Sequence, residues 1–259
     1  MLYIESRTSD KVKEWCRLRD SAAARRRQGA FWAEGLRLCT DLAGTCPVHT
    51  VLCTPQALEA HPALAALGGP GARRALVSES VAAKLSDTPS PQGVFAVLGL
   101  PAMGGPVAPG SRCLVLENVQ DPANVGALAR SAAAFGFSHL FLCGACADPF
   151  SPKALRASMG ALARLRLHRG DVQQAADTLR GADIPLYAAA LYNSLPLGQV
   201  QCPAGAGVAV MIGNEGNGLT EQAIAAADTA VRIPMAGDVE SLNAAVAGGV
   251  LLWHFRGQA

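Results

Sequence analysis

The chain has 259 residues, of which 50% are hydrophobic and 16% charged, a composition that is typical of a folded protein and excludes an intrinsically disordered one. Its net charge of +2 is too small to indicate a nucleic-acid partner by itself, so the distribution of charge along the chain has to decide that question. No apolar run reaches the roughly 18 residues of a membrane helix, and the N-terminus lacks the apolar core of a signal peptide. We therefore predict a cytoplasmic protein without a membrane partner.

The eight cysteines are scattered through apolar stretches, which favours buried free thiols in a reducing compartment over disulfides. Cys143 and Cys146 form one Cys-x-x-Cys pair, but a zinc site of the common kind needs a second pair, so we expect no bound metal. The remaining cysteines are Cys16, Cys39, Cys46, Cys53, Cys113 and Cys202.

A basic segment opens the chain. Residues 9–28 contain no proline and are rich in alanine, lysine and arginine, which predicts one helix ending before Gly29. A solvated helix surface would explain such a charge run, but an arginine triplet close to Phe31 and Trp32 also suits contact with RNA phosphates beside stacking groups. We expect this segment to bind RNA through Arg7, Lys11, Arg17, Arg25, Arg26, Arg27 and Arg37.

Short alternating segments follow and predict a small α/β domain. The expected strands are Ala30–Ala33, Val48–Cys53, Ala75–Val77 and Gly93–Leu98, and the expected helices are Gly35–Leu42, Pro55–Ala60 and Ser80–Leu85. Residues 99–111 are rich in glycine and proline with almost no charge, which is typical of a linker. We therefore divide the chain into domains at 1–98 and 112–259, joined by this linker.

Strands and helices alternate again after the linker, which predicts a parallel sheet whose ligands bind at the carboxyl ends of its strands. A second basic patch without acidic residues begins at Lys153 and Arg156, which we add to the expected RNA contacts. The predicted strands are Arg112–Leu116, Phe137–Leu142, Leu186–Leu191, Val208–Ile212 and Ala230–Ile233, and the predicted helices are 125–135 with Asn124 as N-cap, Ala154–Ala163, 171–180, Thr220–Ala227 and Leu242–Phe255.

Polar residues follow three of these strands. The run 208–212 is continuously apolar, as in a strand buried on both faces, and it breaks into a loop with three glycines and Glu215. A plain turn would explain the glycines equally well. Arg130 lies in the helix after the first strand, where a salt bridge or a dipole role is the alternative to a site. Ser241 reads as the N-cap of the last helix, and Asn243, inside its first turn, is a poor helix former there unless its amide has a partner.

These segments together resemble a known family. Asn124-x5-Arg130, Ile212-Gly-Asn-Glu-Gly-Asn-Gly218 and Ile233-Pro-Met followed by Ser241-Leu-Asn243 look like the three motifs of the SpoU/TrmH-type RNA ribose 2′-O-methyltransferases of the SPOUT superfamily. The stretch from Lys153 to Ala161 also resembles a family segment. The first hundred residues resemble the L30e-like substrate-binding domain that many members carry.

The resemblance implies an α/β fold with a deep trefoil knot in the C-terminal domain, and S-adenosylmethionine held by the knot loops. Glycines there allow the backbone to approach an adenosine, and the chain has neither a P-loop nor a G-x-G-x-x-G after the strand. The residues expected at the cofactor are Ala190, Leu191, Met211, Ile212, Gly213, Asn214, Gly216, Ile233, Met235, Ser241 and Leu242.

The resemblance also implies that Arg130 is the catalytic arginine and that Asn124, Glu215, Ser241 and Asn243 hold it and the ribose. We expect Glu215 to neighbour Arg130. Since the guanidinium of an arginine normally has a pKa above 12, orientation of the hydroxyl and stabilisation of the alkoxide are at least as plausible as direct deprotonation. Family members are homodimers, with the final helix in the interface.

We therefore predict a methyltransferase that acts on the ribose 2′-hydroxyl of one nucleotide in structured RNA, with 23S ribosomal RNA favoured. The alternatives are methylation of transfer RNA and a noncatalytic RNA-binding or ribosome-assembly factor with the same fold.

Overall fold

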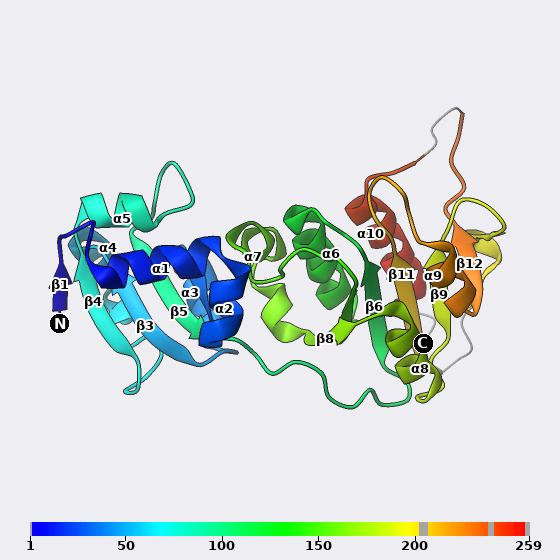
Figure 1. Cartoon of the computed structure of the whole chain (residues 1–259), viewed down its shortest axis with the longest axis horizontal. Helices are drawn as coiled ribbons and strands as arrows, with labels where there is room; N and C mark the ends of the chain where they lie inside the picture. Colours follow the sequence, from blue (N-terminus) through cyan, green and yellow to red (C-terminus); the bar gives the residue numbers. More distant parts are fainter. Residues whose placement is uncertain (1, 202–206, 238–240, 257–259) are drawn as a thin grey trace. The chain divides into compact units, whose positions relative to one another are not determined.

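The computed structural model describes residues 2–201, 207–237 and 241–256 (Figure 1). By its internal contacts the chain forms two compact units. The first combines the described residues up to Pro101 with Phe150–Ala163, and the second combines Ala102–Pro149 with the described residues from Arg164 onwards. Within these described ranges no helix is both long and apolar enough to cross a membrane.

The first unit is built on a five-stranded mixed sheet in the order β1-β4-β3-β5-β2. The pairs β1–β4 and β3–β4 are parallel, whereas β5 is antiparallel to both of its neighbours. The strands are β1 (Leu2–Ile4), β2 (Ala30–Glu34), β3 (Val48–Cys53), β4 (Arg73–Val77) and β5 (Val94–Gly99).

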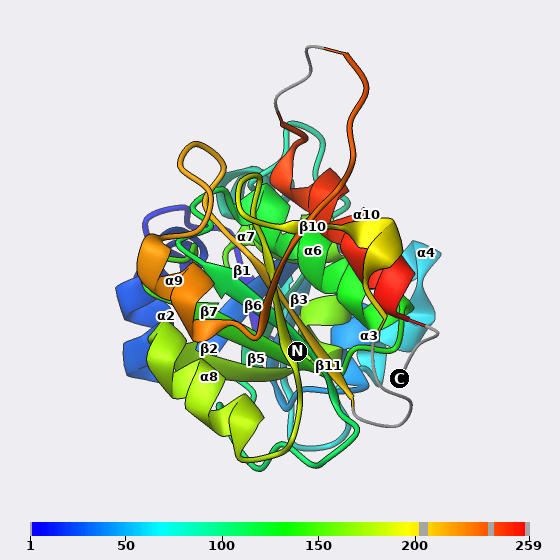
Figure 2. The same cartoon turned by 90° about the vertical axis from the view of Figure 1, so that its right-hand side faces the viewer.

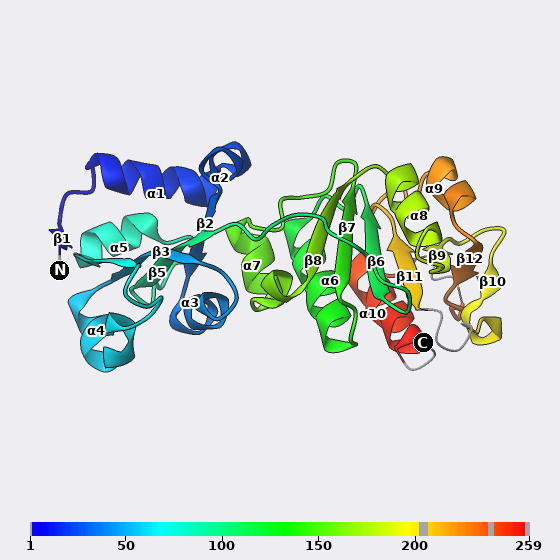
Figure 3. The ribbon, with the colours of Figure 1, turned by 90° about the horizontal axis from the view of Figure 1, so that it is seen from below.

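Helices cover both faces of this sheet, with α1 and α5 on one side and α3 and α4 on the other (Figure 3). Trp15 of α1 belongs to the same buried cluster as Trp32 of β2 and Phe95 of β5, and the last two rings stack with centroids 5.2 Å apart. The helices are α1 (Asp10–Asp20), α2 (Ala22–Gln28), α3 (Leu36–Ala43), α4 (Pro55–Ala60) and α5 (Glu79–Leu85), with a 3-10 turn at Pro62–Ala65.

The single helix expected over residues 9–28 is wrong. Ser21 adopts an extended backbone and accepts a hydrogen bond from the Ala24 N–H, so it begins a new helix, α2. The carbonyls at the end of α1 find a partner in the Arg25 guanidinium, which donates to Leu18 and Arg19 at 2.6 and 2.7 Å. An arginine that caps the preceding helix stabilises the break.

A segment from the middle of the sequence completes the first unit. Residues 150–163 carry α7 (Pro152–Ser158) and the first three residues of a 3-10 turn at Ala161–Arg164. Phe150 packs against the fully buried Phe31 of β2, with ring centroids 4.9 Å apart. The helix expected over Ala154–Ala163 ends early, because Met159 and Gly160 both take a positive φ.

The second unit contains a seven-stranded parallel sheet in the order β10-β12-β9-β11-β6-β7-β8. β11 has the bounds predicted from its apolar run, and all five of its residues are buried. The short β1 and β10 and the basic β8 were not predicted. The strands are β6 (Arg112–Glu117), β7 (His139–Cys143), β8 (Arg166–Gly170), β9 (Leu186–Ala189), β10 (Leu195–Pro196), β11 (Val208–Ile212) and β12 (Thr229–Arg232).

Two pairs of helices flank this sheet, α8 and α9 on one face and α6 and α10 on the other (Figure 2). The helices are α6 (Pro122–Ala134), α8 (Val172–Arg180), α9 (Glu221–Ala226) and α10 (Ala244–Phe255), with a 3-10 turn at Leu197–Gln199. Burial raises the pKa of the Cys113 and Cys143 thiols to about 12. The described cysteines are free thiols, as expected, and Cys202 lies outside the described residues.

Two predicted helix starts are wrong, in opposite directions. Asp121, not Asn124, is the N-cap of α6, and Pro122 at the first helical position places Asn124 inside the first turn. Asn243, not Ser241, is the N-cap of α10, where its side chain accepts from the N–H groups of Ala245 and Val246. An asparagine that looked misplaced within a helix is therefore a normal cap.

Gly248 allows α10 to pack tightly on α6, and its role can be tested against the adjacent Gly249. A Cβ built on Gly248 would lie 2.1 Å from Cδ2 of the fully buried Leu128, whereas one on Gly249 would meet only Ser131 Oγ at 4.0 Å. We expect Gly248→Ala to lower the free energy of unfolding by about 1–3 kcal/mol through overpacking. Gly249→Ala should raise it by about 0.5–1 kcal/mol, because alanine favours the helix. Urea denaturation measures both, and equal effects of the two substitutions would contradict this account.

Candidate active site

Four neighbouring parallel strands, β12, β9, β11 and β6, end at the same edge of the second sheet. The loops that follow them contain the predicted motif residues. Parallel α/β sheets bind their ligands at this edge, so the topology brings together segments that are far apart in the sequence.

The glycine loop after β11 is a closed turn. Asn214 and Gly218 exchange two backbone hydrogen bonds of 2.9 Å each. A Cβ on Gly213 would lie 2.3 Å from the Gly218 backbone, so the turn can close only over a glycine. Gly218 has a φ of +68°, and a Cβ there would meet nothing within 4 Å, which leaves this side of the loop open.

Asn214 holds the turn to the strand beside it. Its Oδ1 accepts from the N–H groups of Gly216 and Asn217 at 2.9 and 3.1 Å. Its Nδ2 donates to the carbonyl of Asn118, directly after β6, at 2.9 Å. The loop conformation therefore depends on a side chain that we expected to contact the cofactor.

A chain of side-chain hydrogen bonds joins three loops at this edge. Asn243 Nδ2 donates to Asn124 Oδ1 at 3.2 Å, and Asn124 Nδ2 donates to Glu215 Oε1 at 2.9 Å. Each of the three predicted sequence motifs supplies one member. The structure therefore brings Asn124, Glu215 and Asn243 together, as predicted.

Glu215 is held by hydrogen-bond donors and not by a cation. Besides Asn124, its carboxylate accepts from the backbone N–H groups of Gln120 and Asp121 at 3.3 and 3.2 Å. Burial raises the pKa of the Glu215 carboxyl, but the hydrogen bonds from Asn124 and the backbone together lower it by more than burial raises it. The net pKa therefore lies below its ordinary value. This carboxylate stays ionised at neutral pH.

Arg130 and Ser241 are not part of this network. Arg130 is exposed on α6, and no hydrogen bond or ion pair joins it to Glu215 or to any other residue that the structure describes. Asn124 is the side chain that donates to the Glu215 carboxylate, and the expectation that Arg130 neighbours Glu215 stays a prediction. Ser241 lies exposed two residues before the cap of α10.

Two residues that sequence reasoning missed fix this edge of the sheet. Glu117, at the end of β6, is buried and accepts from both the hydroxyl and the backbone N–H of Thr220, at 2.7 and 2.9 Å. Asn118 has a φ of +54°, and its Oδ1 accepts from the Ala145 N–H at 2.8 Å. The signal that could have found them is a charged and a polar residue placed directly after an apolar strand.

The residues expected at the cofactor fall into two groups. Met211 and Ile212 are buried in β11, so only their backbone can approach a ligand. Leu191 and Leu242 are exposed apolar side chains in the loops after β9 and β12, while Ala190, Ile233 and Met235 are half-buried. The glycine loop contains no lysine or arginine, which fits a ligand without phosphate groups.

Most of the residues expected at RNA are on the surface. Arg25 is the exception: it is 4% exposed and caps α1, so its guanidinium is not available to a phosphate. Arg156 is half-buried and pairs with Asp87 at 2.8 Å. The exposed members are Arg7, Lys11, Arg17, Arg26, Arg27, Arg37 and Lys153.

Comparison with known proteins identifies the family. Residues 111–253 match the SpoU rRNA Methylase family and residues 9–96 match the MRM3-like substrate binding domain. The chain therefore belongs to the SpoU rRNA methylase family and carries an MRM3-like substrate-binding domain before its methylase domain.

Individual relatives span nearly the whole chain. The 23S rRNA (guanosine(2553)-2′-O)-methyltransferase RlmP of Bacillus subtilis (strain 168) is 30% identical over 99% of this chain and 100% of its own length. A solved structure of a putative RNA methyltransferase of the TrmH family from Porphyromonas gingivalis has a TM-score of 0.85 at 31% identity, covering 97% of this chain and 99% of its own. An AdoMet-bound rRNA methyltransferase from Sinorhizobium meliloti has a TM-score of 0.85 at 29% identity, covering 97% and 96%.

The network predicts a measurable change at Glu215. Asn124→Ala removes the side-chain donor to the carboxylate, so we expect the pKa of Glu215 to rise. Asn217→Ala is the matched control. It removes an asparagine side chain from the loop that contains Glu215, but Asn217 is hydrogen-bonded to Asn214 through its backbone N–H, which the substitution keeps. Carboxyl-detected NMR titration of the full chain measures the pKa of Glu215 in both variants. An unchanged pKa in Asn124→Ala would count against the network.

Proposed function

We infer that this chain transfers a methyl group from S-adenosylmethionine to the ribose 2′-hydroxyl of a nucleotide in ribosomal RNA. The observation that carries the inference is the hydrogen-bonded set Asn243–Asn124–Glu215 at the carboxyl ends of adjacent strands, in a chain of this family. A noncatalytic RNA-binding protein would have no evident need for such a set together with Arg130. We further propose that the RNA is 23S rRNA, because the RlmP relative that acts on it aligns along the whole chain.

The loops at this edge suit the adenosyl cofactor. The open side of the glycine turn allows the backbone to approach a ligand, exposed Leu191 and Leu242 offer apolar contacts, and the loop lacks phosphate-binding cations. When bound, S-adenosylmethionine supplies an electrophilic methyl group on a sulfonium. The residues that would hold it are Ala190, Leu191, Met211, Ile212, Gly213, Asn214, Gly216, Ile233, Met235, Ser241 and Leu242.

Arg130 is the proposed catalytic residue. A ribose hydroxyl must lose its proton as it attacks, and negative charge develops on its oxygen. A guanidinium without a protein partner among the described residues can orient the hydroxyl and stabilise that charge. The Asn124, Glu215 and Asn243 network would position the loops around it, and Ser241 would contact the ribose or the cofactor.

The proposed RNA contacts are the exposed members of the predicted set, with Arg25 left out: Arg7, Lys11, Arg17, Arg26, Arg27, Arg37 and Lys153. Phosphate contacts of this kind position an RNA and make its binding dependent on salt. An enzyme that modifies ribosomal RNA works where ribosomes are assembled, which supports the predicted cytoplasmic location.

The role of Arg130 has a direct test. We expect Arg130→Ala to abolish methyl transfer to ribosomal RNA while calorimetry shows unchanged binding of S-adenosylmethionine. Arg180→Ala, which removes an exposed arginine from α8 of the same unit, is the control and should keep full activity. Full activity of Arg130→Ala would remove Arg130 from the mechanism, and failure of the folded wild-type chain to bind the cofactor would favour a noncatalytic RNA-binding protein.

We also propose a homodimer through α10. Val246, Val250 and Trp253 recur at helical spacing along one face of this helix and are 54%, 39% and 53% exposed. Gly248 does not belong to this face, because it packs on Leu128 of its own chain. An exposed apolar stripe on an otherwise buried helix is typical of a subunit interface.

A charged residue within the exposed stripe of Val246, Val250 and Trp253 should separate the subunits of the proposed dimer. We expect Val250→Glu to convert a dimer into a monomer in size-exclusion chromatography with light scattering, since a carboxylate would be buried without a partner in the interface. Met103→Glu, at another exposed apolar position of the same unit, should leave the mass unchanged. A wild-type chain that remains monomeric at every concentration would overturn the proposal.

A further inference from the structure

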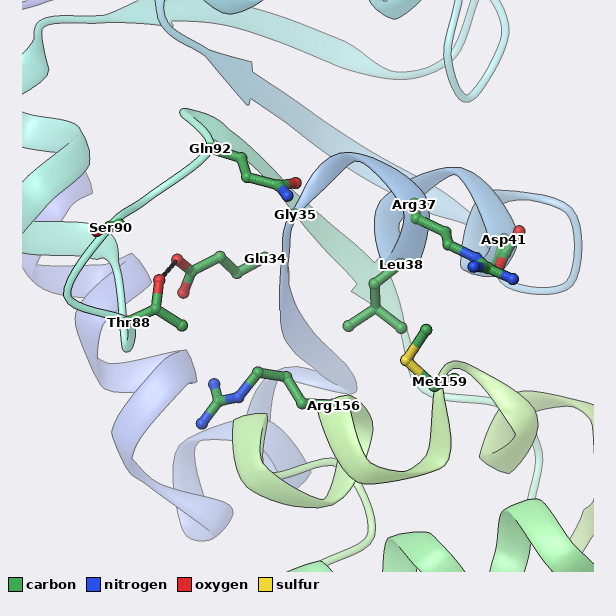
Figure 4. Close-up of a pocket in the computed structure, with 10 residues that line it drawn as sticks. All are labelled: Glu34, Gly35, Arg37, Leu38, Asp41, Thr88, Ser90, Gln92, Arg156 and Met159. Carbon is green, nitrogen blue, oxygen red and sulfur yellow. Dashed lines mark hydrogen bonds and ion pairs between the residues drawn. The ribbon is translucent and has the colours of Figure 1, made fainter.

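The first unit contains a pocket of about 360 Å³ that the proposed chemistry does not use (Figure 4). This volume is within the range of small-ligand sites. Three segments that are distant in the sequence form it: the end of β2 with the start of α3, the loop before β5, and α7. The residues that the argument uses are Glu34, Arg37, Leu38, Gln92, Arg156 and Met159.

One side of the pocket is apolar. Leu38 of α3 and Met159, directly after α7, point toward one another across it (Figure 4). Met159 has a φ of +50°, which ends α7, and its side chain is exposed. A flat apolar group could lie against these two side chains.

The opposite side offers a carboxylate with spare capacity. Glu34 accepts from the Ser86 and Thr88 hydroxyls and from the Asp87 N–H. An ionised carboxylate has about four acceptor sites, so about one remains for a ligand N–H. The hydrogen bonds already made fix the carboxylate in one position.

An amide donor and cations complete the lining. Gln92 Oε1 accepts from the Leu36 N–H at 2.9 Å, and its Nε2 has no partner among the described residues. Arg37 has a side chain that is 81% exposed and lies 3.9 Å from Asp41, so it is only weakly paired. Arg156 brings a second guanidinium, paired with Asp87.

We propose that this pocket takes the base of one unstacked nucleotide of the RNA substrate. The base lies against Leu38 and Met159, donates an N–H to Glu34 and accepts from Gln92, and its phosphate pairs with Arg37. Single-stranded RNA is recognised in this way, by splayed bases that are packed on side chains and hydrogen-bonded at their edges. The proposal rests on the proposed function, since it takes RNA as the substrate.

The lining favours a nucleotide over a purely apolar or purely anionic ligand. An apolar ligand would cover the remaining acceptor site of Glu34 and the Gln92 Nε2 donor without giving either one a hydrogen bond. A phosphate alone would meet the Glu34 carboxylate as well as the arginines. A nucleotide supplies a flat apolar face, an edge with both donors and acceptors, and an anion in one ligand.

The test uses the full chain and the four ribonucleoside 5′-monophosphates as probes. Ligand-observed NMR should detect binding to the wild type. Leu38→Trp, which fills the pocket, should weaken that binding by about tenfold, equivalent to about 1.4 kcal/mol. Leu58→Trp changes a half-buried leucine on α4 of the same unit, away from the pocket, and should bind as the wild type does.

Arg37→Ala and Arg73→Ala form a second matched pair that changes only exposed side chains of this unit. Arg37→Ala should weaken nucleotide binding and Arg73→Ala should not. This pair therefore tests the proposal even if Leu38→Trp does not fold. Absence of binding to the wild type, or equal binding by both members of the folded pairs, overturns it.

Methyl transfer separates this proposal from the proposed function. In the presence of ribosomal RNA and S-adenosylmethionine, Leu38→Trp should raise the KM for RNA with little change in kcat and no change in cofactor affinity. If the wild type binds nucleotides in the expected pattern but never methylates RNA, the proposed function fails and the pocket stands. If it methylates RNA and binds no nucleotide, the pocket fails alone.

Discussion

The hydrogen bond from Asn243 to Asn124 determines which atoms donate and which accept throughout the Asn243–Asn124–Glu215 network. Asn243 Oδ1 is committed to capping α10, so only its Nδ2 can face Asn124. Asn124 must then present its Oδ1 to Asn243, which turns its Nδ2 toward Glu215. A side-chain amide accepts at its oxygen and donates at its nitrogen, whereas aspartate at 124 would lack the donor to Glu215 and leucine would lack both groups. The cap of one helix thereby orients a carboxylate 28 residues earlier in the chain.

In this arrangement hydrogen-bond dipoles, and not a cation, stabilise the ionised carboxylate of Glu215. Two backbone N–H groups and an amide stabilise the carboxylate, so no arginine is required for that purpose. A guanidinium that formed a short ion pair with Glu215 would have to give up that interaction before it could act on a substrate. Arg130 forms no such ion pair with any residue that the structure describes, and it is exposed to solvent.

Buried strands were easier to predict from the sequence than the hydrogen-bond partners of polar side chains. The apolar run 208–212 predicted β11 and its parallel neighbours, because a strand covered on both faces is typically apolar along its length. The break at Ser21 was missed because it depends on Arg25 capping a helix that it does not belong to. Three of the five catalytic candidates meet in one network. Which of their atoms are hydrogen-bonded depends on where α6 and α10 begin, and helix propensity does not specify the N-cap residues of these helices. The trefoil knot stays a prediction.

The position of residues 150–163 makes the first unit discontinuous in sequence. The chain passes between the two units three times, after Pro101, before Phe150 and after Ala163, so cleavage of the linker would divide the first unit itself and leave its Phe150–Ala163 segment on the methylase fragment. A fragment that stops at the linker would also lose Phe150 and expose the ring of Phe31 that it covers. The substrate-binding part therefore cannot be exchanged between relatives as one continuous stretch: a functional graft has to carry a piece of the methylase sequence with it.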